Sequence, residues 1–475
     1  MRRPSTHRGL QRFRVNARSL QPDRVAAGVL LIIGALHLTA AVLSHSSARA
    51  FLSPRFSLVI AAAFLGLVLL GTMSIALLAM TVAVVPALQL GKVSVAGIVF
   101  DPVLVLGAAL GTGLLFRLFS AKANCLRPWT NTGAISFSAA IAAAAAVTLS
   151  SIANGQSLSE CVPWCVGAGV AMSLILSARL GYLRLSAIPV ALLIGFAISA
   201  TLDLLRYLRG GFVVTGEFDT GRFYGGMADW ELIAEFYAVG IVIALATLVH
   251  VRQLVVSLLA LFVIGTGFVL VFATHSRSPV ILLAIACPLL LIVPLAGRTV
   301  PRTHLVLIVA GAISLGLSLM PLILSSRTFS RLLSGTAQGG DFARSLNRAF
   351  IWPRVVSDPT FASSGLFGNG PVGAFEWFGT YPHNLVLWTI WSLGIFGCVF
   401  VALLAATGIF AVIQWRKYSW VTVSLGFSVI FLLTDETVIE FPRVGSMIVF
   451  VLALCALTGA ASILERNEVL GLPAE

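Results

Sequence analysis

Residues 365–397, GLFGNGPVGAFEWFGTYPHNLVLWTIWSLGIFG, join a glycine-rich turn to a long apolar run. Gly368 and Gly370, next to Pro371, favour a tight and irregular backbone that can approach a ligand closely. They match neither a Rossmann nor a P-loop fingerprint, because no strand–turn–helix unit surrounds them. His383 stands where the polar part ends and the apolar run begins. The stretch therefore predicts a helix that enters a membrane, with a histidine at the membrane surface.

The apolar character of this stretch extends over the whole chain. Hydrophobic residues make up 58% of the sequence and charged residues 10%, and the mean hydropathy is +1.00. This composition excludes a soluble domain of this length. Because unpaired backbone groups are costly in hydrocarbon, apolar runs of about 20 residues must be helices. We expect an all-α, polytopic membrane protein with about 12–14 transmembrane helices and one large periplasmic loop.

Hydropathy and charge divide the chain into five parts. We expect a basic cytoplasmic tail at 1–24, a transmembrane region at 25–325, a large periplasmic loop at 326–382, C-terminal transmembrane helices at 383–463 and a cytoplasmic tail at 464–475. The predicted spans are 25–44, 57–73, 75–90, 100–118, 132–152, 162–178, 186–205, 231–249, 254–273, 279–296, 305–325, 384–413, 419–434 and 442–463. Two crossings within 57–90, rather than one, place Arg117, Lys122 and Arg127 on the cytoplasmic side, as the positive-inside rule requires.

Several arginines violate that rule. On this topology Arg277 lies in a tight outer turn. One outer loop contains Arg206, Arg209 and Arg222, and the large loop contains Arg327, Arg331, Arg344, Arg348 and Arg354. Positive charge clustered on the outer side predicts an anionic partner, and the planar guanidinium suits a diphosphate. The alternative is that single arginines pair with nearby carboxylates or face lipid headgroups. The net charge of +13 does not indicate nucleic-acid binding, because no folded basic domain holds it.

His383 has two interpretations. Imidazole titrates near neutrality and is the usual group for removing a proton from a sugar hydroxyl. Alternatively, the histidine caps the start of the following helix together with Asn384. The sequence contains no Asp-x-Asp pair, HExxH or Cys/His cluster, so we expect chemistry without a metal or other cofactor. Cys161 and Cys165 are close enough in the sequence for a disulfide, although their surroundings favour two separate apolar-site cysteines.

Four segments resemble the superfamily of O-antigen ligases and O-antigen polymerases, which are bacterial membrane glycosyltransferases. The segments are GRFYGGMADWELIA from Gly221, HSRSPVILL from His275, RAFIWPRVV followed by GLFGNGPVGAF, and YPHNLVLWTIWSLGIFG. They are similar to the family's arginine-x-x-glycine segment, its serine-arginine turn at the head of a span, its arginine and glycine-x-glycine loop, and its proline-histidine-asparagine helix start. The resemblance covers roughly the C-terminal half of the chain, and the last segment is the most specific.

The resemblance implies a GT-C-like fold and a metal-independent, inverting transfer. A glycan would move from an undecaprenyl-diphosphate carrier to an acceptor glycan hydroxyl at the periplasmic face of the bacterial inner membrane. His383 would be the general base. Arg222, Arg348 and Arg277 would bind the donor diphosphate, and Asn384, Gly368 and Gly370 complete the expected substrate-binding set.

The chain also departs from the family pattern. Trp230 and Glu231 stand where proline and asparagine are common, and Trp388 and Ser392 stand where acidic or amide residues are common. His383 therefore lacks an obvious orienting carboxylate in its own helix. Candidates for that role from the last outer loop are Asp435, Glu436 and Glu440.

Three functions stay open at this stage. A polymerase adds repeat units to a lipid-linked chain, whereas a ligase moves a finished chain to lipid A core, and both need the same donor site. We lean towards the polymerase in surface-polysaccharide (O-antigen or exopolysaccharide) assembly, with a chain-length regulator as a further candidate partner. A flippase of lipid-linked glycans is the rival from another class, and it predicts charged groups facing a cavity inside the spans.

Overall fold

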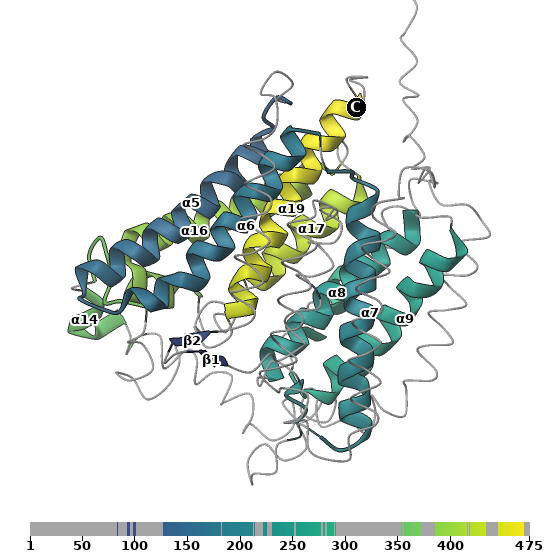
Figure 1. Ribbon diagram of the computed structural model, residues 1–475, viewed down its shortest axis with the longest axis horizontal. Helices are drawn as coiled ribbons and strands as arrows, with labels where there is room; N and C mark the ends of the chain where they lie inside the picture. The colour runs from purple at the N-terminus through teal and green to yellow at the C-terminus, as the bar shows by residue number, and fades with distance from the viewer. Residues whose placement is uncertain are drawn as a thin grey trace, which may run out of the picture.

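The computed structural model of the chain is drawn in Figure 1. It describes residues 83, 93–95, 98–100, 127–181, 183–211, 213, 222–225, 230–250, 253–276, 279–280, 283–288, 290, 353, 356–362, 364–371, 385–415, 417, 419–433 and 445–469. The predicted spans at 25–44, 57–73, 75–90, 100–118 and 305–325 lie wholly or mostly outside these residues. The same holds for the basic tail and for most of the predicted loop at 326–382.

Long apolar helices dominate the described residues. They are α5 (Asn131–Ala153), α6 (Val162–Arg179), α7 (Ala187–Leu208), α8 (Trp230–His250), α9 (Leu254–Ala273), α16 (Leu385–Ile413), α17 (Trp420–Leu432) and α19 (Gly445–Val469). All except α17 are long and apolar enough to cross a membrane, which makes seven candidate spans in this part of the chain. The chain is therefore a multi-pass membrane protein, and the helical class predicted for its spans is confirmed.

A few short elements accompany the spans. A 3₁₀ turn, η5 (Leu158–Cys161), precedes α6, and α14 (Pro359–Ala362) is a single helical turn. The strand β1 (Val93–Val95) pairs antiparallel with β2 (Ile98–Phe100). This hairpin was not expected from the sequence, which predicted only helices.

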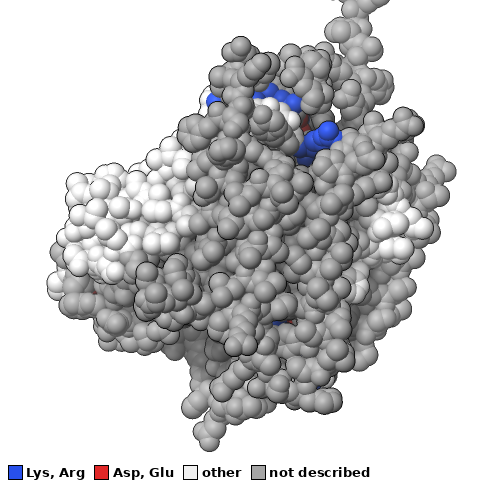
Figure 2. All heavy atoms as spheres, in the orientation of Figure 1, with Lys and Arg blue, Asp and Glu red and all other residues white. Residues whose placement is uncertain are grey.

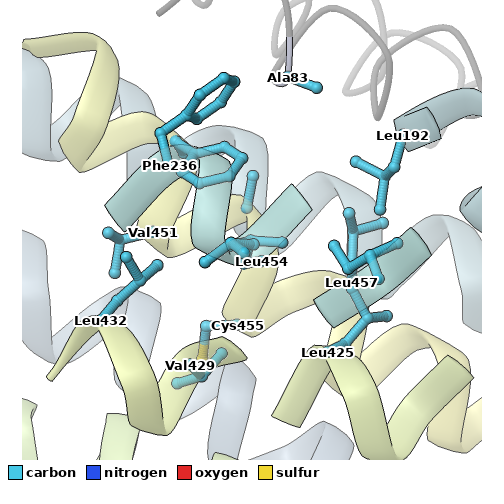
Figure 3. Packing of buried hydrophobic residues seen from close by; sticks show 14 of the residues in the cluster. Ala83, Leu192, Phe236, Leu425, Val429, Leu432, Val451, Leu454, Cys455 and Leu457 are labelled. Atoms are coloured by element: carbon cyan, nitrogen blue, oxygen red, sulfur yellow. The ribbon is translucent and has the colours of Figure 1, made fainter. Parts of the chain in front are cut away.

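The helices pack as one bundle in which α8 and α19 are central. The α6 helix packs against α19, α5 packs against α16, and α8 contacts α7, α9 and α17 (Figure 1). The windows of α8 and α19 that could span a membrane are completely buried among the other elements. Figure 3 shows part of this core, where Phe236 of α8 lies near Val451 and Leu454 of α19. Phe236 also packs on the ring of Phe450 at a centroid distance of 5.2 Å, which joins the second turns of α8 and α19.

One end of the bundle, called here the Arg179 end, collects basic side chains. The Arg127 N–H donates to the Arg179 carbonyl at 2.8 Å, which joins the start of α5 to the end of α6. The Arg179 guanidinium lies 4.2 Å from the centroid of the Trp129 ring. Arg466, near the end of α19, donates to the Trp129 carbonyl at 2.9 Å. Figure 2 shows described lysine and arginine side chains grouped at this end of the visible face.

Hydrogen bonds of Glu465 bring the start of α17 to the same end. Its carboxylate accepts from the Ser419 N–H at 2.6 Å and from the Thr422 hydroxyl at 2.6 Å. A carboxylate at a helix N-terminus satisfies backbone donors and matches the helix dipole. The opposite end of the bundle, called the Arg222 end, therefore holds the last turns of α5, α7 and α9 and the first turns of α8, α16 and α19.

Candidate functional site

Arg222 lies in a short segment, residues 222–225, that is held at the Arg222 end. The Phe223 N–H donates to the carbonyl of Ala273, the last residue of α9, at 3.0 Å. Phe223 is completely buried and packs edge-on against Tyr207 of α7, with ring centroids 5.5 Å apart. It also forms an isolated antiparallel bridge with Val213. Arg222 itself is half-buried, next to this anchor.

The bond to Ala273 brings two of the sequence motifs together. Ala273 directly precedes the turn that begins the serine-arginine motif, where His275 adopts a φ of 56°. A positive φ is uncommon for a residue other than glycine, although histidine adopts it more readily than most. The Ser276 N–H in the same turn donates to the Thr274 hydroxyl at 3.2 Å. Arg277 follows directly, outside the described residues, so the motifs from Gly221 and His275 meet at one place in the fold.

A buried charged group lies in α7 next to this segment. Asp203 is completely buried and accepts two bonds, from Arg206 Nη1 at 2.9 Å and from the Tyr237 hydroxyl of α8 at 2.7 Å. Arg206 is one of the arginines predicted from the sequence to lie on the outer side, whereas no role was predicted for Asp203. A signal for it was present, because an aspartate three residues before an arginine interrupts an otherwise apolar run.

The glycine loop, defined as residues 364–371, contacts a break in α16. The helix is interrupted at Gly394, whose φ and ψ are 62° and −151°. Backbone groups of the loop pair with the backbone groups of α16 that the break leaves without a partner inside the helix. The Asn369 N–H donates to the Trp391 carbonyl at 2.8 Å, and the Gly370 N–H donates to the Ser392 carbonyl at 3.0 Å. In return, the Ile395 N–H donates to the Gly365 carbonyl at 3.2 Å.

Side chains at the end of α5 add to this junction. The Ser150 hydroxyl donates to the Ser392 carbonyl at 2.9 Å, and the Asn154 amide donates to the Gly368 carbonyl at 3.0 Å. Irregular backbone inside a membrane protein is tolerated where protein groups satisfy it. The loop and α5 together meet that requirement for the interrupted helix.

The predicted close approach of the glycines is therefore observed, but to the protein's own helix. A Cβ atom on Gly368 would overlap the backbone of Ser392, and the Gly368 φ of 69° is one that other residues rarely adopt. Gly370 lies against the side chain of Gln156. These contacts account for both glycines without a ligand, and their substrate-binding role stays a prediction.

Trp388 and Ser392, which depart from the family pattern, are both buried in the first half of α16. Trp388 has 1% of its surface exposed and Ser392 has none. The indole nitrogen and the serine hydroxyl have no hydrogen-bond partner in the described part of the chain. Neither residue supplies a carboxylate or amide at that position, so these two positions provide no orienting partner for His383.

Most of the predicted catalytic set lies outside the described residues. This applies to His383, Asn384, Arg348 and Arg277. It applies equally to the candidate carboxylates Asp435, Glu436 and Glu440. The helix predicted to begin beside His383 is present, because α16 starts at Leu385.

The two described parts of the predicted site lie at the same end of the bundle but well apart. In Figure 1, α14 and the glycine loop that follows it are at the left edge, whereas α7 and α9, which hold the Arg222 segment, are at the right. The structure therefore brings Arg222 to the serine-arginine turn and separates it from Gly368 and Gly370.

Cys161 and Cys165 are both free thiols, which resolves the alternatives left open by their spacing. The Cys161 thiol lies 3.3 Å from the Ser151 hydroxyl of α5. No group of three or more histidine, cysteine or acidic residues that could hold a metal occurs among the described residues. Metal-independent chemistry stays a prediction from the sequence.

No family model matches the chain, and no curated protein matches it either. The resemblance to the O-antigen ligases and polymerases therefore rests on the four sequence segments.

Proposed function

We propose that the protein is a membrane glycosyltransferase. It transfers a glycan from undecaprenyl diphosphate to a hydroxyl of an acceptor glycan during surface-polysaccharide assembly. The observation that carries the proposal is the hydrogen bond from Phe223 to Ala273, which unites the Arg222 motif with the turn leading to Arg277. Two arginine motifs that are distant in the sequence thus meet, as a diphosphate site requires.

The distribution of charge supports the sidedness of this reaction. Arg127, Arg179 and Arg466 share one end of the bundle and follow the positive-inside rule, so the Arg179 end is assigned to the cytoplasm. The Arg222 end then faces the periplasm, where lipid-linked glycans are joined. Arginines on that side have no role in orienting the chain and are explained by an anionic substrate.

The chemistry assigns one role to each motif. The acceptor oxygen attacks the anomeric carbon of the donor while the bond from that carbon to the diphosphate oxygen breaks. The diphosphate leaves with the bonding electron pair, and Arg222, Arg277 and Arg348 stabilise its charge. His383 takes the proton of the acceptor hydroxyl. Direct displacement inverts the anomeric configuration.

The glycine loop has a supporting part in this proposal. Its bonds to the carbonyls of Trp391 and Ser392 fix the short half of α16 that follows His383. A rigid support for a catalytic group preserves its geometry during the reaction. Gly368 and Gly370 then support the helix backbone that follows His383, whether or not they also contact the substrate.

The proposal is tested with purified full-length protein, an undecaprenyl-diphosphate oligosaccharide and an acceptor, without nucleotide or metal. Released undecaprenyl diphosphate is measured for the wild type, for His383→Ala and for His45→Ala, a histidine on the same predicted side with no assigned role. We expect release to be lost in His383→Ala and retained in His45→Ala. If His383→Ala releases undecaprenyl diphosphate at the wild-type rate, the transferase assignment is wrong.

The same assay separates the remaining alternatives. Supplying either a lipid-linked acceptor or a lipid A core acceptor distinguishes a polymerase from a ligase, and we expect the lipid-linked acceptor to be used. A flippase would support glycan translocation in vesicles while releasing no undecaprenyl diphosphate.

A further inference from the structure

The Asp203 carboxylate is an unusual feature of α7. It is completely buried, and it lies in the last third of a helix with the composition of a membrane span. Transferring a carboxylate from water into such surroundings has a large desolvation free energy. The attraction within an ion pair offsets this free energy only when the geometry of the pair is good. Ionisable groups inside membrane spans are rare, and they usually mark a functional site.

Asp203 connects two helices and directs an arginine. One carboxylate oxygen accepts from the Tyr237 hydroxyl of α8, and the other binds Arg206 Nη1 at 2.9 Å. Asp203 and Arg206 are three positions apart, so both lie on one face of α7. The Arg206 side chain is 14% exposed, whereas Asp203 is not exposed at all. The pair therefore extends from the interior towards the Arg222 end.

Arg206 and Arg222 stand on neighbouring segments. The Gly211 N–H donates to the Arg206 carbonyl at 2.9 Å and so forms the turn that ends α7. After this turn, Val213 bridges to Phe223. Tyr207, the next residue after Arg206, packs against Phe223, the next residue after Arg222.

We propose that Arg206 is a further diphosphate-binding residue beside Arg222, and that Asp203 is the positioning residue that holds it there. This inference rests on the proposed function, because it concerns the same donor site. A guanidinium carries five N–H donors, so a carboxylate bound at one edge fixes its plane while another edge meets phosphate oxygens. Tyr237 in turn fixes the carboxylate.

The electrostatics set the expected order of effects. Asp203 offsets part of the charge of Arg206, so Arg206 contributes directed hydrogen bonds more than net attraction. Because the family resemblance makes Arg222 a main ligand of the diphosphate, we expect its loss to weaken donor binding more than the loss of Arg206. If Asp203 only joins α7 to α8 through Tyr237, it affects the stability of the fold and not the affinity for the diphosphate.

The test measures binding without transfer. Purified full-length protein in detergent is titrated with undecaprenyl diphosphate, with undecaprenol as the matched lipid that lacks the diphosphate, and thermal unfolding is recorded in parallel. We expect Arg206→Gln and Asp203→Asn each to weaken diphosphate binding about tenfold, the scale of one lost hydrogen bond to a charged group, and to leave undecaprenol binding unchanged. We expect Arg206→Lys to weaken diphosphate binding as well, because a lysine lacks the planar fork of a guanidinium.

The double variant decides whether Asp203 acts through Arg206. In the Arg206→Gln background, adding Asp203→Asn should give no further loss of affinity. A further loss equal to that of Asp203→Asn alone, or single variants that lower the unfolding temperature with unchanged affinity, would overturn the inference. If Asp203→Asn does not fold, Tyr237→Phe takes its place, with the ion pair intact and a smaller loss expected.

The outcome separates this inference from the proposed function. Wild-type protein that binds undecaprenyl diphosphate no better than undecaprenol would overturn both. Wild-type protein that prefers the diphosphate and catalyses transfer, together with Arg206 variants of unchanged affinity, would overturn only the role of Arg206 and Asp203.

Discussion

The glycine loop and the Arg222 segment lie at the same end of the bundle, yet they are attached to it in different ways. The loop is joined to α16 and α5 mainly through backbone groups, with glycines where other residues would not fit. The Arg222 segment is attached through the backbone bond from Phe223 to Ala273, the bridge between Phe223 and Val213, and the buried ring of Phe223. A buried ion pair lies in the adjacent helix α7. One region completes a broken helix, whereas the other contains a buried ion pair in an apolar span.

This difference shows how two similar signals can have different origins. Glycines clustered before a histidine suggest a loop that approaches a ligand, but a helix interruption needs the same close approach of backbone to backbone. A buried carboxylate in an apolar span has no comparable structural reason, because a hydrophobic residue at the same place would avoid the free energy of desolvation. We therefore expect changes in the loop to affect folding and changes near Arg222 to affect substrate.

The largest effect is expected at the break in α16. In Gly394→Ala the new Cβ would lie 2.5 Å from the Leu366 carbonyl and 2.6 Å from the Gly365 oxygen. The φ and ψ at this position are also adopted almost only by glycine, so we expect a loss of about 2–6 kcal/mol from strain and overlap. The measurement is thermal unfolding in detergent, followed by size-exclusion chromatography.

Gly169→Ala is the matched control, since no atom lies within 4 Å of a Cβ built at Gly169 in α6. Alanine is the better helix former, so this variant should be at least as stable as the wild type. Equal unfolding temperatures for the two variants would contradict the role given to the glycine loop.

The next largest effect is expected at Arg222 and concerns activity. Arg222→Gln removes a charged donor from the leaving diphosphate, and we expect release of undecaprenyl diphosphate to fall about 10²-fold. The fold should be retained, because Phe223 and its bond to Ala273 do not involve the arginine side chain. Arg209→Gln, at an exposed position at the end of α7, is the control. Equal losses in the two variants would indicate a general effect of surface charge.

The helices were largely predictable from the sequence. The span predicted at 254–273 is the helix Leu254–Ala273, and the span predicted at 132–152 is the helix Asn131–Ala153. This agreement has a physical reason, because the thickness of the bilayer sets the length of an apolar run. The last helix continues to Val469, beyond the boundary predicted at 463, since polar residues can extend a helix outside the membrane.

The long-range features of the site were not predictable in the same way. Gly394 alone does not indicate a break, because glycine is frequent in intact membrane helices. The break depends on partners in residues 364–371 and at Ser150, which only the tertiary fold supplies. Tyr237, the partner of Asp203 in another helix, is likewise supplied only by the tertiary fold. The sequence could indicate that Asp203 was unusual, but it could not identify the group that satisfies it.

A smaller effect is expected from Tyr237→Phe. This variant tests how much the buried Asp203 carboxylate, next to the Arg222 segment, contributes to stability. The variant removes the hydroxyl that donates to Asp203 at 2.7 Å and leaves the ring in place. Polar bonds between helices in membrane proteins contribute about 1 kcal/mol, so we expect a modest decrease in unfolding temperature. Tyr207→Phe keeps the ring that packs on Phe223 and serves as the control. In the Asp203→Asn background the effect of Tyr237→Phe should shrink, and an undiminished effect would show that the hydroxyl does not act through the carboxylate.

The smallest effect is expected from Ser150→Ala at the α16 break. The Ser150 hydroxyl donates to the Ser392 carbonyl at 2.9 Å, but that carbonyl also accepts from the Gly370 N–H at 3.0 Å. Because one donor remains, we expect a loss of about 0.6 kcal/mol in thermal unfolding. Ser173→Ala is the control, as the Ser173 hydroxyl is buried without a hydrogen-bond partner in the described part of the chain, and its removal should be neutral or stabilising. If the two serine variants are equally stable, the glycine loop alone satisfies the interrupted helix and α5 contributes only packing.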